Sequence, residues 1–410
     1  MTCDRRRFLR ECASVAALSI GPPLGLAGCA SASRVDSSRA DASGAVATTA
    51  TSHRAGYERL LILVELKGGN DGLNTVVPYR DAHYYALRPT LAIARNAVVQ
   101  LSDRAGLHPS LAPLADCWRR GELAILQGVG YPAPNLSHFR SIEIWDTASP
   151  SDRYIATGWL TRTFATVPTP TRFAADGFVV GSYDLGPLDG GARAVTLGKV
   201  GSMAGHAMRA PAPGVVHPEA LAHILRVEAD TAQAASRMRG NVALATTFPE
   251  GPIGNAARIA CSAIAEAKDV AIVRITQTGY DTHANQAPTQ ARLLGELAQA
   301  LVALAGGLRA LGRYDDALIV TYAEFGRRPH ENLSAGTDHG TASVHFALGG
   351  RVAGGFLGAP PDLAGLSADG NPAHAIDFRS VYATVLERWW GVDSSAILGG
   401  RFPPLPFVRA

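Results

Sequence analysis

The sequence has 410 residues, of which 47% are hydrophobic and 18% are charged, and its formal net charge is +3 at pH 7. A chain of this length and apolar content can bury a large core, which excludes a wholly disordered protein. The basic residues are spread along the chain and form no stripe interleaved with aromatic residues, so no nucleic-acid partner is expected.

Residues 1–29 have the features of a bacterial export signal. Arginines at positions 5 to 7 precede Phe8 and Leu9, and an apolar stretch follows from Cys12 to Ala27. This stretch is interrupted by Pro and Gly, and it is shorter than the run of about 20 apolar residues that a membrane-spanning helix needs. The paired arginines resemble the twin-arginine pattern, which implies export of the folded protein by the twin-arginine machinery.

The signal ends in Leu26-Ala27-Gly28-Cys29, which resembles the lipobox of bacterial lipoproteins. Cys29 would then become the lipidated first residue and attach the protein to a membrane. Ordinary cleavage between Ala27 and Ala32 is the alternative, and it leads to the same periplasmic or cell-envelope location. Residues 30–56 lack large apolar side chains, so they are predicted to form a disordered tether.

Residues 57–410 are predicted to form one α/β domain. Four short apolar runs are typical of strands buried on both faces of a parallel sheet. These runs are Leu60–Leu66, Leu123–Val129, Val270–Ile275 and Ala317–Tyr322. Further helices are predicted at His108–Arg120, His217–Arg239, Asn255–Ala267, Gln290–Leu311 and Ile376–Trp390. The helix between the third and fourth strands makes a βαβ unit, so we expect a three-layer sandwich around a largely parallel sheet.

Two features of this domain stay open at the level of sequence. The segment from about 167 to 217 is rich in Gly, Pro and Ala, with a short β-like piece at Phe178–Val180, and is predicted to be an insertion or cap. Cys117 and Cys261 are the cysteines of the folded part. Their spacing does not decide whether they pair, and the absence of a C-x-x-C motif gives no support for redox chemistry or a thiolate metal site.

Polar residues follow the carboxyl end of each predicted buried strand, which is the edge where open α/β sheets bind ligands. They are Asp71 after the first strand, Ser137 and His138 after the second, Asp281 and His283 after the third, and Glu324, Asp338, His339 and His345 after the fourth. Carboxylates and imidazoles together form a ligand set for a divalent metal, with Zn²⁺ favoured and Mn²⁺ or Ca²⁺ as alternatives. One Asp–His pair occurs by chance and a lone histidine is usually structural, but several such groups at one edge require a cation among them.

Three other residue types at this edge have two interpretations each. Ser137 begins a helical stretch and is either a helix N-cap or a nucleophile. Gly68 and Gly69 make a tight turn, and a glycine-rich turn also lets backbone approach a bound ion. Arg327 is either a bidentate clamp for phosphate or sulfate or a member of a solvated salt bridge beside Glu324.

Seven segments together resemble the family named domain of unknown function 1501, which is itself similar to the alkaline-phosphatase and sulfatase superfamily. They are Leu66–Tyr79 (LKGGNDGLNTVVPY), Leu107–Leu114 (LHPSLAPL), Asn135–Trp145 (NLSHFRSIEIW), Gly279–Gln286 (GYDTHANQ), Glu324–Arg328 (EFGRR), Gly336–Ser343 (GTDHGTAS) and Asp377–Glu387 (DFRSVYATVLE). The resemblance implies an alkaline-phosphatase-like fold with two adjacent metal sites beneath a hydroxyl nucleophile.

The resemblance also implies a division of the ligands. Asp71, Ser137, Asp338 and His339 would surround one metal, and Asp281, His283 and His345 would surround the other. Two differences from the superfamily limit how far its ligand roles apply to this sequence. Asp281 and His283 are closer in sequence than the corresponding residues of the phosphatases, and the C/S-x-P-x-R signature of sulfatases is missing. Classical sulfatase chemistry is therefore not expected.

The sequence thus predicts a metal-dependent hydrolase of a phosphate or related oxyanion ester, in which Ser137, His138 and Arg327 are catalytic. The alternative is a lipoprotein that binds or assembles in the cell envelope, keeping the fold and the metal without turnover. A role as an accessory to an oxidoreductase is suggested only by the export route.

Overall fold

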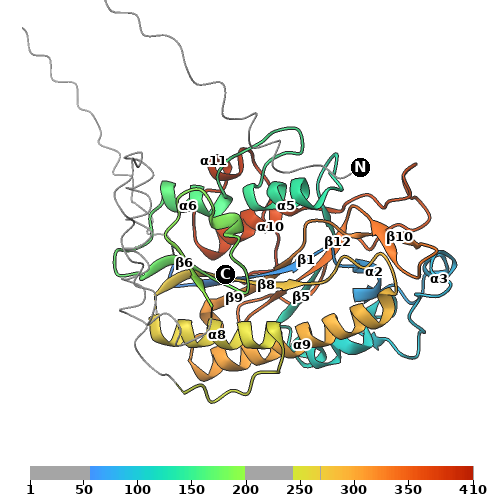
Figure 1. The fold of residues 1–410 in the computed structure, drawn as a ribbon, viewed down its shortest axis with the longest axis horizontal. Coiled ribbons are helices and arrows are strands. Elements are labelled where there is room, and N and C mark those ends of the chain that lie inside the picture. Colours follow the sequence, from blue (N-terminus) through green and yellow to red (C-terminus); the bar gives the residue numbers. More distant parts are fainter. Residues whose placement is uncertain (1–55, 199–242, 268, 410) are drawn as a thin grey trace, which may run out of the picture. The chain divides into compact units, whose positions relative to one another are not determined.

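The computed structural model describes residues 56–198, 243–267 and 269–409. The export signal, the tether up to residue 55 and the predicted helix His217–Arg239 lie outside these residues. The described chain contains a large sheet with helices on both faces, as the alternation of apolar runs and helical patterns predicts (Figure 1).

The described residues form a nine-stranded sheet that contains all four predicted buried strands. From one edge to the other its strands are β13 (Gly355–Leu357), β5 (Leu123–Gly130), β12 (Ser343–Leu348), β9 (Ala317–Tyr322), β1 (Leu60–Lys67), β8 (Val270–Thr278), β6 (Ala175–Val180) and β7 (Ala194–Leu197), and β14 (Ile376–Asp377) pairs with β5. Only β12 among them runs antiparallel to its neighbours. The strands β1, β8 and β9 therefore end at the same edge of the sheet.

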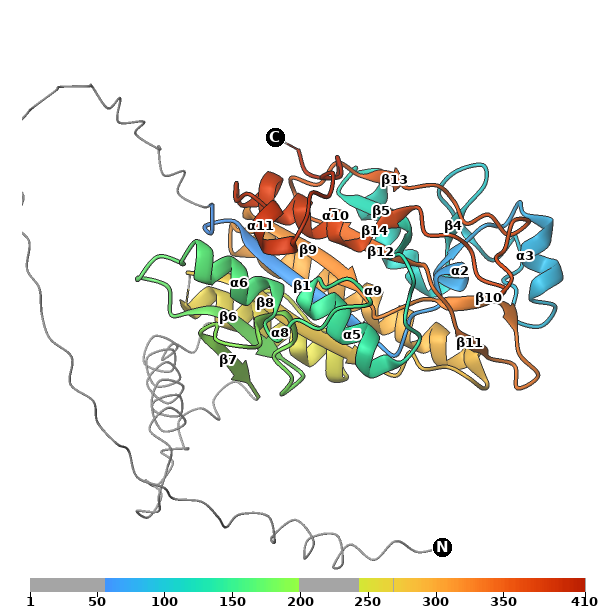
Figure 2. The ribbon, with the colours of Figure 1, turned by 90° about the horizontal axis from the view of Figure 1, so that it is seen from above.

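Helices cover both faces of the sheet, which confirms the three-layer architecture (Figures 1 and 2). One face carries the 3-10 turn η1 (Pro109–Leu114), α4 (Ala115–Arg119), α8 (Pro252–Ala267) and α9 (Gln286–Ala310). The other carries α5 (His138–Thr147), α6 (Trp159–Thr166), α10 (Phe378–Ala383), the π-helical turn η5 (Thr384–Trp389) and α11 (Ser395–Leu398). In α9 the buried leucines recur every three or four residues, which is the periodicity that predicted this helix.

Smaller elements lie around the ends of the central strands. They are α2 (Gly72–Thr75), β2 (Val76–Val77), α3 (Ala82–Leu87), β3 (Val99–Gln100), β4 (Gly106–Leu107), η2 (Gly186–Leu188), η4 (Tyr314–Asp316) and the antiparallel pair β10 (Arg327–Glu331) and β11 (Thr337–His339). Figure 2 shows α2, α3, β10 and β11 gathered at one end of the sheet. This is the end at which β1, β8 and β9 finish.

The structure describes two features that the sequence left open, the segment predicted as an insertion and the two cysteines of the folded part. Of the segment predicted as an insertion, residues 167–198 are described, and their strands β6 and β7 continue the central sheet beyond β8. Cys117 and Cys261 are both buried and both free, so they form no disulfide with each other.

Candidate metal centre

Two of the predicted ligands, Asp281 and His339, meet His138, which was predicted to be catalytic, at the carboxyl edge of the sheet. His138 is the first residue of α5, Asp281 follows β8, and His339 ends β11. Their nearest ligand atoms all lie within 4.8 Å of one another. Loops far apart in the sequence therefore converge, as the positions of these residues after the central strands predicted.

Asp281 stands at the middle of this cluster. Its Oδ1 lies 3.0 Å from Nε2 of His283 and 3.2 Å from Nε2 of His339. Its Oδ2 lies 3.4 Å from Nε2 of His138. One carboxylate thus contacts three imidazoles that come from three different segments of the chain.

The orientation of His339 is set by a backbone carbonyl. Its Nδ1 lies 2.8 Å from the carbonyl oxygen of Leu136, which can only accept a hydrogen bond. The ring proton is therefore on Nδ1, and Nε2 presents a lone pair toward Asp281 and toward Nε2 of His283, which is 2.9 Å away. A histidine whose other ring nitrogen is bound to a carbonyl is the usual arrangement of a metal ligand.

Glu324 follows the end of β9 and supports the cluster, a role that its sequence position alone did not specify. Its Oε1 lies 2.9 Å from Nδ1 of His138 and accepts a 2.8 Å hydrogen bond from the backbone of Gly68. Among the described residues, neither Oε2 of Glu324 nor Nε2 of His138 has a hydrogen-bond partner, and both atoms are buried. The position of Glu324 directly after a buried strand was the signal for this role.

The charges of the central groups follow from these contacts. Partial burial alone would raise the pKa of Asp281, but the hydrogen bond and the charge of Arg327 lower that pKa to about 2. Desolvation lowers the pKa of His339, while the hydrogen bond to Glu324 raises the pKa of His138. At neutral pH the cluster therefore presents an ionised carboxylate beside a neutral imidazole of His339.

Asp338 takes an outer position in the cluster. Its Oδ1 accepts a 3.2 Å hydrogen bond from Nδ2 of Asn332 and lies 3.5 Å from Nδ1 of His283. The hydrogen bond from Asn332 lowers the pKa of Asp338. Asp338 therefore lies next to Nδ1 of His283, at a longer distance than the carbonyl of Leu136 from Nδ1 of His339.

Arg327 does not have the substrate-binding role predicted for it. Its side chain is 0% exposed and donates to the carbonyl oxygens of Gly69 at 2.9 Å and Thr337 at 3.0 Å. It also donates to the carbonyl of Gly68 and, at 2.6 Å, to Oδ1 of Asp281. A guanidinium enclosed in this way has no face for a phosphate or sulfate, so it positions Asp281 instead.

Asp71 does not join the cluster. It is the N-cap of α2, where its Oδ1 accepts from the backbone of Leu73 at 3.1 Å. Both carboxylate oxygens are also bound by the buried guanidinium of Arg88. The helix that begins directly after the glycine turn orients Asp71 toward Arg88, a residue that the sequence analysis did not single out.

His345 also lies outside the cluster. It belongs to β12 and is 1% exposed, and its ring packs edge-on against Trp145 with the ring centroids 5.3 Å apart. Neither ring nitrogen has a hydrogen-bond partner among the described residues. Burial lowers its pKa to about 3, so His345 is a neutral core residue at pH 7.

Ser137 directly precedes His138, a member of the cluster. It occupies the N-cap position of α5, but its side chain makes no capping hydrogen bond, and the residue is exposed. Both sequence neighbours contact the cluster, Leu136 through its carbonyl and His138 through its ring. The backbone therefore places Ser137 between two residues that contact the cluster.

The residues present fit a divalent metal ion. Asp281 supplies an ionised oxygen, and His138, His283 and His339 direct ring nitrogens toward it. Zinc prefers this mixture of imidazole nitrogen and carboxylate oxygen. Coordination of an ion would give a partner to the buried Nε2 of His138, which lacks a hydrogen-bond partner in the described chain.

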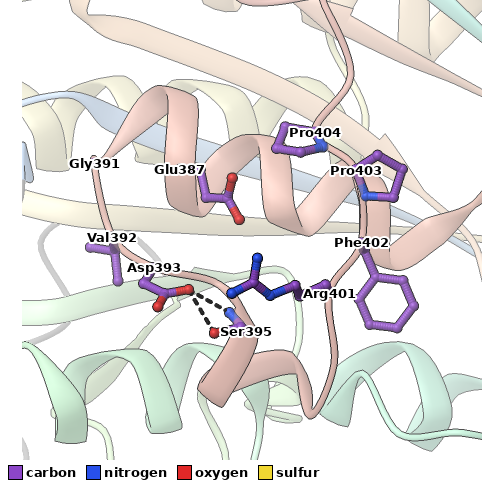
Figure 3. A pocket seen from close by; sticks show the side chains of 9 residues that line it. All are labelled: Glu387, Gly391, Val392, Asp393, Ser395, Arg401, Phe402, Pro403 and Pro404. Carbon is purple, nitrogen blue, oxygen red and sulfur yellow. Dashed lines mark hydrogen bonds between the residues drawn. The ribbon is translucent and has the colours of Figure 1, made fainter.

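A separate cavity of about 640 Å³ lies near the carboxyl terminus (Figure 3). Its lining includes Glu387 of η5, Asp393 and Ser395 near α11, and Arg401 of the terminal segment. The indole of Trp389, in the same η5 turn, donates to the carbonyl of Leu60 at the start of β1. The cavity is therefore associated with the beginning of β1, whereas the candidate metal centre lies beyond its end.

Comparisons with known proteins give a family and several distant structural likenesses. No curated protein matches the sequence of the chain. The structure is similar to the zinc complex of the C-terminal periplasmic domain of EcEptC from Escherichia coli (9% identity, 71% of this chain and 72% of that chain, TM-score 0.34). It is also similar to the lipoteichoic acid synthase LtaP from Listeria monocytogenes (10%, 84% and 75%, TM-score 0.37) and to the PsFucS1 sulfatase from Pseudoalteromonas sp. (10%, 85% and 70%, TM-score 0.39).

The family assignment comes from the sequence and covers most of the folded part. The sequence model of one family matches residues 58–399, which include every described element from β1 to α11. The chain therefore belongs to the family described as protein of unknown function (DUF1501).

Proposed function

We propose that this protein is an exported, metal-dependent hydrolase that acts on a phosphate or related oxyanion ester, with Zn²⁺ as its first candidate metal. The observation that supports this proposal most is the 2.8 Å contact between Nδ1 of His339 and the carbonyl oxygen of Leu136. Because a carbonyl can only accept, we assign the ring proton to Nδ1, so the Nε2 lone pair faces Asp281 and His283. A neutral imidazole held in this way is prepared to coordinate a metal.

His138, Asp281, His283 and His339 would hold the ion, and Glu324, Asp338 and Arg327 would orient these ligands. A divalent ion bound there would supply Lewis-acid stabilisation of the negative charge on the ester oxygens. Residues of the chain would supply the nucleophile and bind the charged ester.

Ser137 is the proposed nucleophile. Its Oγ would form a bond to the phosphorus as the bond to the alcohol leaving group breaks, and water would then cleave the serine ester and restore the hydroxyl. The proton of the hydroxyl would pass to a solvent water molecule as the bond to phosphorus forms, and water would protonate the departing alkoxide. The amino end of α5 favours the negative charge of the ester at this place.

Export and membrane attachment are part of the same proposal. The support is the sequence of residues 1–29, with its paired arginines before Phe8 and its Cys29 after a lipobox-like run. Expression of a Cys29→Ser variant tests the anchor. We expect it to move from the membrane fraction to the soluble envelope fraction, and retention in the membrane would contradict lipidation of Cys29.

The enzymatic proposal is tested by reconstituting the purified protein with Zn²⁺, Mn²⁺ or Ca²⁺ and measuring bound metal and ester hydrolysis together. The substrates are a phosphomonoester, a phosphodiester and a sulfate ester. We expect bound metal and turnover of at least one phosphate ester. Absence of any bound divalent ion after reconstitution would rule the proposal out.

Ser137→Ala separates the enzyme from a metal-stabilised binding lipoprotein. Because the hydroxyl makes no capping hydrogen bond, its removal should leave the fold and the metal content unchanged. An enzyme loses turnover in this variant. A binding protein keeps its cellular phenotype in Ser137→Ala and loses it only when a metal ligand such as Asp281 is replaced.

A further inference from the structure

The carboxylate of Asp71 has no lone pair left for a metal ion. Its Oδ1 accepts from the backbone of Leu73 at 3.1 Å and from Nη2 of Arg88 at 3.0 Å. Its Oδ2 accepts from Nη1 of Arg88 and from Nε2 of Gln286, each at 2.5 Å. An ionised carboxylate offers about four acceptor positions, and four donors occupy them here.

The N–H donors of Arg88 are also fully occupied. Its Nε donates to the carbonyl of Pro329 at 2.8 Å, and its Nη2 donates to the carbonyl of Arg328 at 3.0 Å. Its Nη1 donates to Oδ1 of Asn74 at 2.9 Å as well as to Asp71. With the two bonds to Asp71, all five N–H groups of the guanidinium have acceptors, and the side chain is 0% exposed.

This pair also connects the loops that carry the candidate ligands. Gln286, which donates to Asp71, accepts a hydrogen bond from Thr282 at 3.0 Å and another from Thr337 at 2.6 Å. Thr282 is next to Asp281 and His283 in sequence, and Thr337 precedes Asp338 and His339. Asp71 therefore acts behind the cluster, through Gln286, rather than within it.

From these contacts we infer that Arg88 is a permanent internal cation that excludes a divalent ion from Asp71, so that the chain binds one metal ion and not two. A second ion at Asp71 would have to displace a bidentate guanidinium from a buried site and remain beside its positive charge. The inference rests on the proposed metal centre at His138, Asp281 and His339. It assigns Asp71 and Arg88 to the buried framework behind the cluster and gives neither a part in binding the ion.

The test is the number of zinc ions per chain, measured by inductively coupled plasma mass spectrometry on the reconstituted, desalted full-length protein. We expect one ion in the wild type and one ion in Asp71→Asn. We expect none in Asp281→Asn, which removes the central ligand. Two ions in the wild type, or loss of an ion in Asp71→Asn, would overturn the inference.

A double variant and the ion count of the wild type distinguish the remaining outcomes. The double variant Asp71→Leu/Arg88→Met removes both buried charges together, so it covers the case in which Asp71→Asn alone fails to fold; it should also bind one ion. No ion in the wild type would refute the proposed function itself, whereas two ions would leave that function standing and refute only the single-ion inference.

Discussion

Nη2 of Arg327 lies 2.6 Å from Oδ1 of Asp281, the same oxygen that contacts His283 and His339. The arginine comes from β10 and the aspartate from the loop after β8, so this contact joins two separate segments at the centre of the cluster. Because the guanidinium is fully buried among backbone carbonyls, it holds the carboxylate in one position.

Arg327→Lys is predicted to weaken metal binding while keeping the positive charge. A lysine ammonium cannot reproduce the planar set of bonds to Gly69, Thr337 and Asp281. Loss of a residue that orients a metal ligand costs about 10- to 100-fold in affinity. Zinc titration against a competing chelator measures the change. The control is Arg292→Lys, an exposed ion pair with Glu296 on α9, and an equal affinity in both variants would contradict the role of Arg327.

Gly68→Ala is predicted to disturb the metal loop. Gly68 has a φ of +118°, and a Cβ added to it would lie 2.4 Å from the backbone nitrogen of Asp281. We expect the free energy of unfolding to fall by about 1–3 kcal/mol from overpacking, together with weaker zinc binding.

Gly312→Ala is the matched control, because Gly312 also has a positive φ (+68°) but its added Cβ meets no atom within 4 Å. It carries the backbone cost of a left-handed alanine without the clash. If urea unfolding and zinc titration give the same result for both variants, the close approach of Gly68 to Asp281 has no energetic role.

Arg274→Met is predicted to destabilise the sheet strongly. Nη2 of Arg274 lies 2.8 Å from Oε2 of Glu65, and both side chains are 0% exposed. Removing one partner of a buried ion pair costs about 3–5 kcal/mol because the other charge stays unpaired. The double variant Glu65→Leu/Arg274→Met should recover part of this loss, as measured by urea unfolding. A double variant no more stable than Arg274→Met would show that the cost does not come from the orphaned carboxylate.

His345 is predicted to make the protein sensitive to acid. Its folded-state pKa is about 3, whereas an unfolded histidine has a pKa of about 6.5. Between these values the unfolded chain binds a proton that the folded chain does not, so stability is full above about pH 6.5 and falls below it by about 1.4 kcal/mol per pH unit.

His345→Leu should therefore flatten the fall in the free energy of unfolding between pH 7 and pH 5, measured by urea unfolding at each pH. The exposed His83 provides the control, because His83→Gln removes an imidazole from the surface instead of from the core. An unchanged slope in His345→Leu would mean that this buried ring is not the group that titrates.

The fold, and the convergence of His138 and Asp281 at one edge of the sheet, could largely be predicted from the sequence. The run Leu60–Leu66 is apolar on both faces, as a central parallel strand requires, and β1 is paired on both sides by parallel strands. Because parallel strands end at one edge, the positions of Asp281 and His138 after separate strands were sufficient to bring them together.

The sequence did not determine the direction of individual side chains at that edge. Asp71 follows β1 as Asp281 follows β8, but the former caps a helix and pairs with Arg88, which lies in a segment with no strand or motif to mark it. His345 follows the fourth predicted strand, but it lies in β12 opposite Leu126 of β5. This position puts it in the core against Trp145. Strand register and core packing decide which way these side chains point. The spacing of residues in the sequence determines neither of them.

Anomalous diffraction at the zinc absorption edge, from crystals of the reconstituted protein, locates the ion. We expect one strong peak among His138, Asp281, His283 and His339, within about 2.0–2.2 Å of the coordinating nitrogen and oxygen atoms. A peak at Asp71, or no peak among these four residues, would show that the metal centre is not the one proposed.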